Sequence, residues 1–157
     1  MKLALVSDSH DNMDAIRRAV AALDGKGIDL LLHAGDYVAP FAVKEWLNLG
    51  VPMAGVFGNN DGERGGIVKA CAGIVRPPLF VEREGKRIAV VHDLSRHDVE
   101  EWGSVDVIVH GHTHRCGIDR RGETLMINPG ESCGWLTGRS TAVVLDLASG
   151  DAEVIEF

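Results

Sequence analysis

The sequence has few cysteines, no long apolar run and no cluster of basic residues, and each absence excludes a class of protein. The three cysteines form no Cys-x-x-Cys pair, and their odd number indicates a reducing compartment rather than a disulfide framework. No apolar run approaches the roughly 20 residues that a membrane span needs. We therefore expect a cytoplasmic protein that does not enter a membrane.

The charge balance argues against a nucleic-acid partner. The 157 residues carry a formal net charge of −7, which repels phosphate backbones unless a basic patch or bound cations reverse the sign locally. The basic residues form no cluster longer than the pairs Arg17-Arg18 and Arg120-Arg121. We therefore expect no binding to duplex DNA or RNA.

Length and composition predict one globular domain over residues 1–157. Hydrophobic residues make up 45% of the chain and charged residues 25%, and no repeat or linker marks off a second domain. The N-terminal segment, residues 2–7, lacks the long apolar stretch and the cleavage site of a secretory signal. We expect it to be the first core strand.

The first third of the chain alternates strands with helices. Further buried strands are expected over residues 28–33 and 51–57. Residues 13–23 have apolar side chains at helical spacing, with Asn12 as the N-cap and glycines just beyond the end. A second helix is expected from Pro40 to about Leu49, with an inward face formed by Phe41, Trp46 and Leu49.

The remainder of the chain is rich in hairpins. The paired strands are expected over residues 79–84 and 86–92, 117–119 and 124–128, and 141–147 and 151–157. Residues 95–101 are expected to form a short helix and residues 105–110 another buried strand. A βαβαβ start with a hairpin-rich finish predicts an α/β fold in which two mixed sheets pack together with helices outside.

Polar residues that suit metal binding follow five of the predicted strands. They are Asp8 and His10, then Asp36, then Asn59, Asn60 and Asp61, then His92 and Asp93, and finally His110, His112 and His114. Ligands of α/β sheets bind at the carboxyl ends of the strands, so these clusters are expected to converge.

The spacing and chemistry of the clusters fit a metal centre. Asp8 and His10, like His112 and His114, are two residues apart and in extended backbone would project to the same side. Mixed oxygen and imidazole donors suit Mn²⁺, Fe or Zn²⁺. A carboxylate such as Asp36 can bridge two ions, and the glycines before Asp36 and Asn59 allow a close backbone approach.

Each cluster taken alone also has an ordinary structural explanation. An Asp-x-His or Gly-Asp after a strand is commonly a plain turn, and the histidines from His110 to His114 are the most specific feature. His33 and His110 end apolar strands, so we expect them in the core or supporting other groups, and we expect Cys116 to be an inert thiol. The joint order of the clusters favours the metal centre.

With these motifs, the chain closely resembles the calcineurin-like metallophosphoesterase superfamily, and within it the small stand-alone phosphodiesterase branch (YfcE-type). The resemblance runs from Lys2 to Phe157, and it includes Asn128-Pro129-Gly130 after the histidine cluster. The family's Asp-x-His, Gly-Asp, Gly-Asn-x-Asp, His and Gly-His-x-His motifs are all present and in order.

The resemblance implies a four-layer α/β/β/α sandwich and a centre of two divalent metal ions. Mn²⁺ is the expected metal, with Ni²⁺, Co²⁺, Fe²⁺ and Zn²⁺ as alternatives. By motif, the first ion is held by Asp8, His10 and His114, the second by Asn59, His92 and His112, and Asp36 bridges the two. The implied reaction is in-line attack of a metal-bridging hydroxide on a small phosphodiester.

Three positions depart from the family pattern. The phosphoprotein phosphatases of the family have a histidine where this chain has Asn60, paired with the following aspartate, here Asp61, and we expect both residues at the catalytic position. Asn60 cannot act as a general acid, which favours diesters or activated aryl esters. Asp93 replaces a common glycine and competes with His92 as a ligand, and Glu131 replaces a serine, which would alter a minor substrate contact.

Two alternatives to a phosphodiesterase stay open. One is a non-catalytic interaction scaffold, because an endosomal sorting subunit resembles this same branch. The other is a nuclease, although Mre11-type relatives carry a histidine after the asparagine and extra DNA-binding segments, and this chain has neither. The sequence leaves the physiological substrate open, and also whether the chain forms a homodimer or a higher homo-oligomer.

Overall fold

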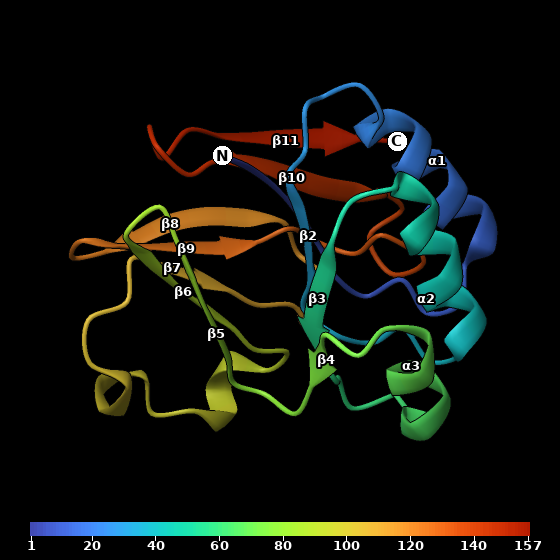
Figure 1. Ribbon diagram of the computed structural model, residues 1–157, viewed down its shortest axis with the longest axis horizontal. Coiled ribbons are helices and arrows are strands. Elements are labelled where there is room, and N and C mark those ends of the chain that lie inside the picture. Colours follow the sequence, from blue (N-terminus) through green and yellow to red (C-terminus); the bar gives the residue numbers. More distant parts are fainter.

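The computed structural model describes all residues from 1 to 157 and contains two mixed β-sheets that pack face to face (Figure 1). The first sheet has the strand order β11-β10-β1-β2-β3-β4 and the second has the order β5-β6-β7-β9-β8. The strands of the first sheet are β1 (Lys2–Val6), β2 (Leu30–His33), β3 (Met53–Val56), β4 (Ile74–Val75), β10 (Thr141–Asp146) and β11 (Ala152–Glu156). Those of the second are β5 (Leu79–Arg83), β6 (Lys86–Val90), β7 (Val107–Val109), β8 (Gly117–Arg121) and β9 (Thr124–Asn128).

The central strands of each sheet run parallel to one another. In the first sheet β1, β2, β3 and β4 are parallel neighbours, and the hairpin of β10 and β11 joins β1 in antiparallel fashion. In the second sheet β6, β7 and β9 are parallel, with β5 and β8 antiparallel at the edges. Loops that follow β1, β2 and β3 therefore leave from one edge, as do those that follow β6, β7 and β9.

The first sheet is buried on both faces, because alternate side chains of its central strands enter two different cores. Leu3 and Leu5 of β1 face the second sheet, where they pack in one cluster with Ile88, Val109 and Ile127. The alternate residues Ala4 and Val6 point to the other face of the sheet and pack against the helices. A strand that is buried on both faces has a continuous apolar sequence, and this is why residues 2–7 are recognisable from sequence as a core strand.

Three α-helices cover the outer face of the first sheet: α1 (Met13–Leu23), α2 (Pro40–Trp46) and α3 (Arg64–Ala70) (Figure 1). The predicted cap of α1 is confirmed, because the Asn12 side chain accepts a hydrogen bond from the Ala15 amide at 3.2 Å. No helix combines the length and apolarity that a membrane crossing requires.

The inward face predicted for α2 is partly wrong. Trp46 is fully buried, but Phe41 is 50% exposed. The buried residues of this helix are Ala42, Val43 and Trp46. Trp46 comes four residues after Ala42 and three after Val43, so the three side chains share one helical face, whereas Phe41 is directed away from it. The α-helix ends at Trp46 and continues as a 3₁₀ turn, η1 (Leu47–Leu49).

The fourth layer, on the outer face of the second sheet, is thin. Ala89, Ile108 and Met126 of this face form a small cluster that is covered by Leu94, Val99 and Trp102. The covering residues come from two 3₁₀ helices, η2 (Leu94–Arg96) and η3 (Val99–Trp102), rather than from the single helix expected over residues 95–101. The sandwich of two mixed sheets between helical layers is confirmed.

Two elements, α3 and β4, were not predicted. Gly65 and Gly66 lie in the first turn of α3, and glycine is a poor helix former. Packing overrides this local preference, because Ile67 of α3 is fully buried in the core beneath the helices. The predicted strands over 28–33, 51–57 and 105–110 are confirmed but shorter, because only residues 30–33, 53–56 and 107–109 belong to the sheets.

Candidate metal centre

The loops that follow the parallel strands of both sheets meet at one edge of the sandwich. Backbone hydrogen bonds join the loop after β1 to the loop after β2, from the Asp8 amide to the Gly35 carbonyl at 3.0 Å and from the His10 amide to the Asp36 carbonyl at 3.0 Å. A further bond, from the Gly111 amide to the His92 carbonyl at 3.0 Å, joins two loops of the second sheet. The predicted convergence of the polar clusters is confirmed.

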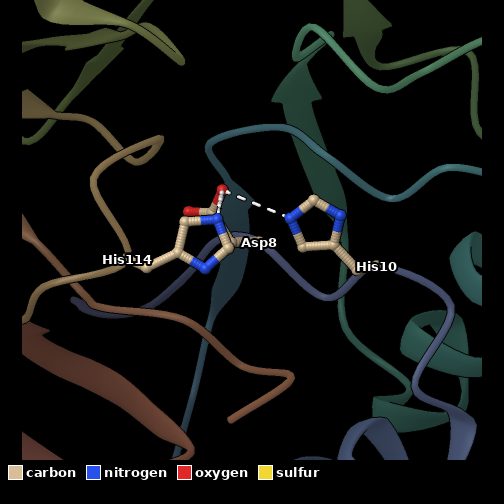
Figure 2. A group of neighbouring side chains, drawn as sticks. All are labelled: Asp8, His10 and His114. Carbon is tan, nitrogen blue, oxygen red and sulfur yellow. Dashed lines mark ion pairs between the residues drawn. The ribbon is translucent and has the colours of Figure 1, made fainter. Parts of the chain in front are cut away.

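Asp8, His10 and His114 form one compact group of potential ligands (Figure 2). Asp8 Oδ1 lies 3.5 Å from His114 Nε2 and 3.9 Å from His10 Nε2. The two imidazole rings stack with their centroids 5.1 Å apart. These distances are longer than hydrogen bonds and suit donor atoms arranged around a shared ion.

Two atoms of this group are buried without any hydrogen-bond partner, namely Asp8 Oδ1 and His10 Nε2. The other oxygen of the carboxylate, Asp8 Oδ2, accepts hydrogen bonds from the Ser7 hydroxyl at 2.6 Å and the His112 amide at 3.1 Å. Burial raises the pKa of Asp8. Orphaned buried polar atoms are rare in native proteins, and a cation between them would satisfy both. The residues present therefore fit a metal ion.

Asp36 lies between this group and a second one. Its Oδ2 atom is 3.5 Å from His10 Nε2 and 3.4 Å from His92 Nε2, so a single carboxylate oxygen faces both groups. Asp8, Asp36 and His92 also form a cluster with ligand geometry. Burial opposes ionisation of Asp36, but His92 and the bonds from Asn60 outweigh it and hold the pKa of Asp36 below its usual range.

The orientation of His92 favours it over Asp93 as a ligand. Its Nδ1 atom lies 2.8 Å from the Ala34 carbonyl, to which it donates, and this directs Nε2 at Asn59 Oδ1, 3.0 Å away, and at Asp36. Asp93 is engaged elsewhere, since its two oxygens accept hydrogen bonds from the Ser95 hydroxyl at 2.6 Å and Arg96 Nε at 3.0 Å. The bond from Ser95 holds the pKa of Asp93 below its usual range.

His112 is an exposed member of the predicted ligand set. Its side chain is 41% exposed, and the ring centroid lies 5.1 Å from that of His92. His112 Nε2 lies 3.7 Å from Asp93 Oδ2. The residue stands beside the second group but is not part of either compact cluster of donor atoms.

The backbone at the candidate ligands is left-handed, not extended. Five of them have positive φ angles, namely Asp8 at 51°, His10 at 42°, Asp36 at 60°, His112 at 68° and His114 at 62°. The expectation that extended backbone aims each i, i+2 pair to one side is therefore wrong. Such conformations are costly for non-glycine residues and cluster at functional sites, where the surrounding loops impose them.

The two glycines that precede the candidate ligands provide the close approach that was predicted. A Cβ atom on Gly35 would lie 2.7 Å from the Gly58 nitrogen and 2.9 Å from His92 Nδ1. A Cβ atom on Gly58 would collide with the Asp36 side chain. The loops after β2 and β3 therefore pack backbone to backbone, which carries Asp36 and Asn59 to the same place.

Asp61 holds loops together and does not face a substrate. Its side chain is buried, with Oδ2 accepting from the amides of Gly58 at 2.7 Å and Asp36 at 3.1 Å, and Oδ1 accepting from the Val38 amide at 2.7 Å. Both oxygens are thus occupied by backbone donors. The carboxylate of Asp61 thereby ties the loop after β2 to the loop after β3.

Asn60 is directed at Asp36. Its backbone amide donates to Asp36 Oδ1 at 2.8 Å, and its side-chain amide donates to Asp36 Oδ2 at 2.8 Å. Asn60 is exposed, so it lies at the mouth of the centre. An amide at this place can orient the Asp36 carboxylate or donate a hydrogen bond, but it has no proton to release at neutral pH.

Glu131 has a role that sequence reasoning missed. It is fully buried, so it makes no substrate contact, and its Oε2 atom accepts a hydrogen bond from His114 Nδ1 at 2.8 Å. It also accepts bonds from the amides of Trp135 and Leu136 and from the Thr137 hydroxyl. Burial opposes ionisation, but these donors lower the pKa of Glu131 to about 2. Histidines that bind metals commonly donate their other ring N–H to a carboxylate. This general rule was the signal that could have pointed to Glu131.

His33, His110 and the thiol of Cys116 lie close to the places expected from sequence. His33 is fully buried. Its Nδ1 atom accepts a hydrogen bond from the Gly35 amide at 3.1 Å, and its Nε2 atom lies 3.2 Å from the Ser9 hydroxyl. Burial holds the pKa of His33 well below its usual value. His110 is half-buried beside Asn128, and Cys116 is an exposed thiol just before β8.

Comparisons with known proteins identify the family of the chain. Residues 1–150 match the family model of the calcineurin-like phosphoesterase superfamily domain. The chain is 33% identical over 154 residues to phosphodiesterase MJ0936 of Methanocaldococcus jannaschii, with 93% of each chain covered. The chain belongs to the calcineurin-like phosphoesterase superfamily.

Two further relatives belong to the same small stand-alone branch. Phosphodiesterase YfcE of Escherichia coli K12 is 29% identical over 145 residues, which cover 83% of this chain and 78% of the relative. A solved structure of an archaeal phosphodiesterase superposes with a TM-score of 0.89 at 31% identity, with 100% of both chains covered. The predicted family and branch are confirmed, and the chain is a phosphoesterase-type hydrolase by family.

Proposed function

We propose that the chain is a phosphodiesterase that works with two divalent metal ions, with Mn²⁺ as the expected metal. One ion would be held by Asp8, His10 and His114, the other by Asn59, His92 and His112, and both by Asp36. The observation that carries the proposal is the pair of orphaned buried atoms, Asp8 Oδ1 and His10 Nε2, that face one another across a gap of 3.9 Å. Two such ions, when bound, supply an ionised water nucleophile and positive charge for the phosphate oxygens.

The residues around the centre prepare it for that chemistry. Ala34 fixes the ring of His92 and Glu131 fixes the ring of His114, so both imidazoles present Nε2 to the centre. Asn60 orients the Asp36 carboxylate through two hydrogen bonds. Pre-set donors of this kind need no rearrangement when a charged substrate arrives.

The amide side chain of Asn60 supports diesters rather than alkyl monoesters as substrates. Asn60 stands where relatives with monoester activity have a histidine, and an amide cannot protonate a leaving alkoxide. Asp61 cannot replace that function, because its carboxylate is occupied by the amides of Gly58, Asp36 and Val38. An aryl leaving group such as p-nitrophenolate departs as a stable anion and needs no such help.

The test is hydrolysis of bis-p-nitrophenyl phosphate with Mn²⁺, Ni²⁺, Co²⁺ and Zn²⁺ supplied separately. We expect metal-stimulated turnover that Asp36→Ala abolishes and that the exposed control Asp119→Ala retains. An alkyl monoester such as glycerol phosphate should be hydrolysed far more slowly than the diester. Absence of turnover with every metal would reject the proposal.

The same purified protein also tests the alternative of a non-catalytic interaction scaffold. A scaffold would hydrolyse neither ester and would retain a stoichiometric protein partner after purification from its host. A nuclease would shift DNA or RNA in gels at low salt, which the formal charge of −7 argues against. We expect neither result.

A further inference from the structure

A cavity of about 260 Å³ opens directly beside the proposed second metal position. Asn59 and His92, two of the proposed ligands, form one of its walls. The lining also includes three arginines, Arg64, Arg76 and Arg96. They come from three separate places in the chain, the start of α3, the residue after β4 and the end of η2.

The first two arginines are free to bind an anion. Arg76 makes no hydrogen bond or ion pair within the chain and is exposed. Arg64 stacks over the Phe57 ring at 5.1 Å and donates from Nε to the Asp61 carbonyl at 3.0 Å, which orients the guanidinium and leaves its terminal nitrogens unused. Neither side chain forms an ion pair with a carboxylate.

The third arginine balances the only carboxylate in the cavity. Arg96 Nε lies 3.0 Å from Asp93 Oδ2. The lining as a whole therefore keeps an excess of positive charge, with two guanidinium groups left over. This contrasts with the formal net charge of −7 of the whole chain, so the positive charge at this one place is local and specific.

The chemistry of the lining favours an anion over an aromatic or apolar group. Phe57 is the only large apolar side chain of the wall, and Arg64 covers its ring. Guanidinium groups match phosphate oxygens in a planar, two-point fashion, and several of them can share one phosphate. Apart from Phe57 and Pro77, the side chains of the lining are charged or polar.

We propose that this cavity binds a second phosphate group of the substrate, next to the phosphate that is cleaved. The preferred substrate is then a diester that also carries a phosphomonoester, such as a nucleotide ester with a further phosphate on its sugar. This inference rests on the proposed function for the position of the cleaved phosphate, but the cavity and its arginines are independent of the metals.

The direct test is calorimetric binding of thymidine 3′,5′-bisphosphate, with Mn²⁺ present and with metals chelated. We expect Arg76→Gln to lower the affinity about tenfold in both conditions, since a charge-assisted bidentate contact is lost. Arg18→Gln is the matched control, because Arg18 is an exposed arginine of α1 on the helical side of the first sheet, and we expect no change. Equal affinity of the wild type and Arg76→Gln would overturn the inference.

A kinetic comparison separates this inference from the proposed function. The p-nitrophenyl ester of thymidine 5′-phosphate and its 3′-phosphorylated counterpart differ by one phosphate only. We expect the wild type to have a kcat/KM about tenfold higher for the second ester and Arg76→Gln to lose this preference. Equal hydrolysis of both esters by wild type and variant would reject phosphate binding in the cavity but would leave the phosphodiesterase activity supported. If neither ester is hydrolysed but bisphosphate binding still depends on Arg76, the phosphodiesterase activity is rejected and phosphate binding in the cavity is supported.

Discussion

His114 Nδ1 donates a hydrogen bond of 2.8 Å to Oε2 of Glu131, a carboxylate that is fully buried. The bond fixes the tautomer and the ring orientation, so that His114 Nε2 faces Asp8 Oδ1 at 3.5 Å. The same carboxylate accepts bonds from the Leu136 amide and the Thr137 hydroxyl and thereby closes the loop after β9. One residue therefore couples the shape of a loop to a candidate ligand.

Glu131→Gln should weaken metal binding without removing a ligand. The neutral amide is a poorer acceptor for His114 and lowers the basicity of its ring, so we expect Mn²⁺ affinity to fall about 10- to 100-fold. Titration calorimetry with Mn²⁺ measures the change. Glu123→Gln, an exposed residue with no side-chain partner, is the control, and equal affinities of Glu131→Gln and wild type would contradict this role.

Asp8→Asn should stabilise the metal-free protein and weaken its stabilisation by metal. Asp8 Oδ1 is buried without a partner and lies in a cluster that also contains the Asp36 carboxylate, so removal of its charge relieves an uncompensated cost of about 1 kcal/mol. We expect a melting temperature a few degrees higher than that of the wild type in a chelator. With excess Mn²⁺ the order should reverse, because the variant loses the binding energy of the ion that Asp8 holds.

Thermal melts in chelator and in Mn²⁺ decide this prediction. The exposed Asp119→Asn variant should follow the wild type in both conditions. An Asp8→Asn variant that melts below the wild type in chelator would mean that the carboxylate is stabilising on its own, and that the site does not depend on a cation.

The position of the centre could be predicted from sequence because it follows from strand order alone. Buried strands are recognisable as apolar runs, and Asp8, Asp36, Asn59, His92 and His112 each come directly after one of them. Parallel pairing then places the strand ends at one edge. This reasoning requires only which strands are parallel, and no detail of the loops.

The local geometry of the centre could not be predicted, because it depends on contacts between distant loops. The positive φ of Asp8 is accompanied by hydrogen bonds from its amide to the Gly35 carbonyl and from the Cys133 amide to its own carbonyl. The role of Glu131 likewise depends on the fold of the segment that follows it. A glycine-containing helix such as α3 is missed for the same reason, since Ile67 is held by packing rather than by propensity.

Asp61 should prove to be a positioning residue rather than a catalytic one. Its carboxylate accepts from the amides of Asp36, Val38 and Gly58, and Asp61→Ala leaves these buried donors without a partner. We expect a loss of unfolding free energy of about 2 to 4 kcal/mol, together with weaker Mn²⁺ binding because Asp36 is no longer held. Urea denaturation and metal titration measure both quantities.

The conservative variant Asp61→Asn distinguishes the two roles. It keeps one acceptor oxygen, so it should recover part of the stability and part of the metal affinity together. A variant with wild-type stability and metal affinity but no turnover would instead assign Asp61 to catalysis.

Trp135 should report metal binding through its fluorescence. Its indole is 63% exposed, and the ring centroid lies 6.2 Å from that of His10, one of the proposed ligands of the first ion. Because Mn²⁺ is paramagnetic and quenches nearby indoles, Mn²⁺ bound by Asp8, His10 and His114 should reduce the emission in a saturable manner. The diamagnetic ion Zn²⁺ should occupy the same place with much less quenching and should block the effect of Mn²⁺ added later.

Two tryptophan variants locate the signal. Trp135→Phe should lose most of the quenching and retain the calorimetric binding of Mn²⁺, because the indole is near the ligands but is not one of them. Trp102→Phe, which removes an indole that packs against Phe80 on the outer face of the second sheet, should retain the quenching. Quenching that survives in Trp135→Phe and disappears in Trp102→Phe would place the first Mn²⁺ away from His10 and would contradict the assignment of Asp8, His10 and His114 as its ligands.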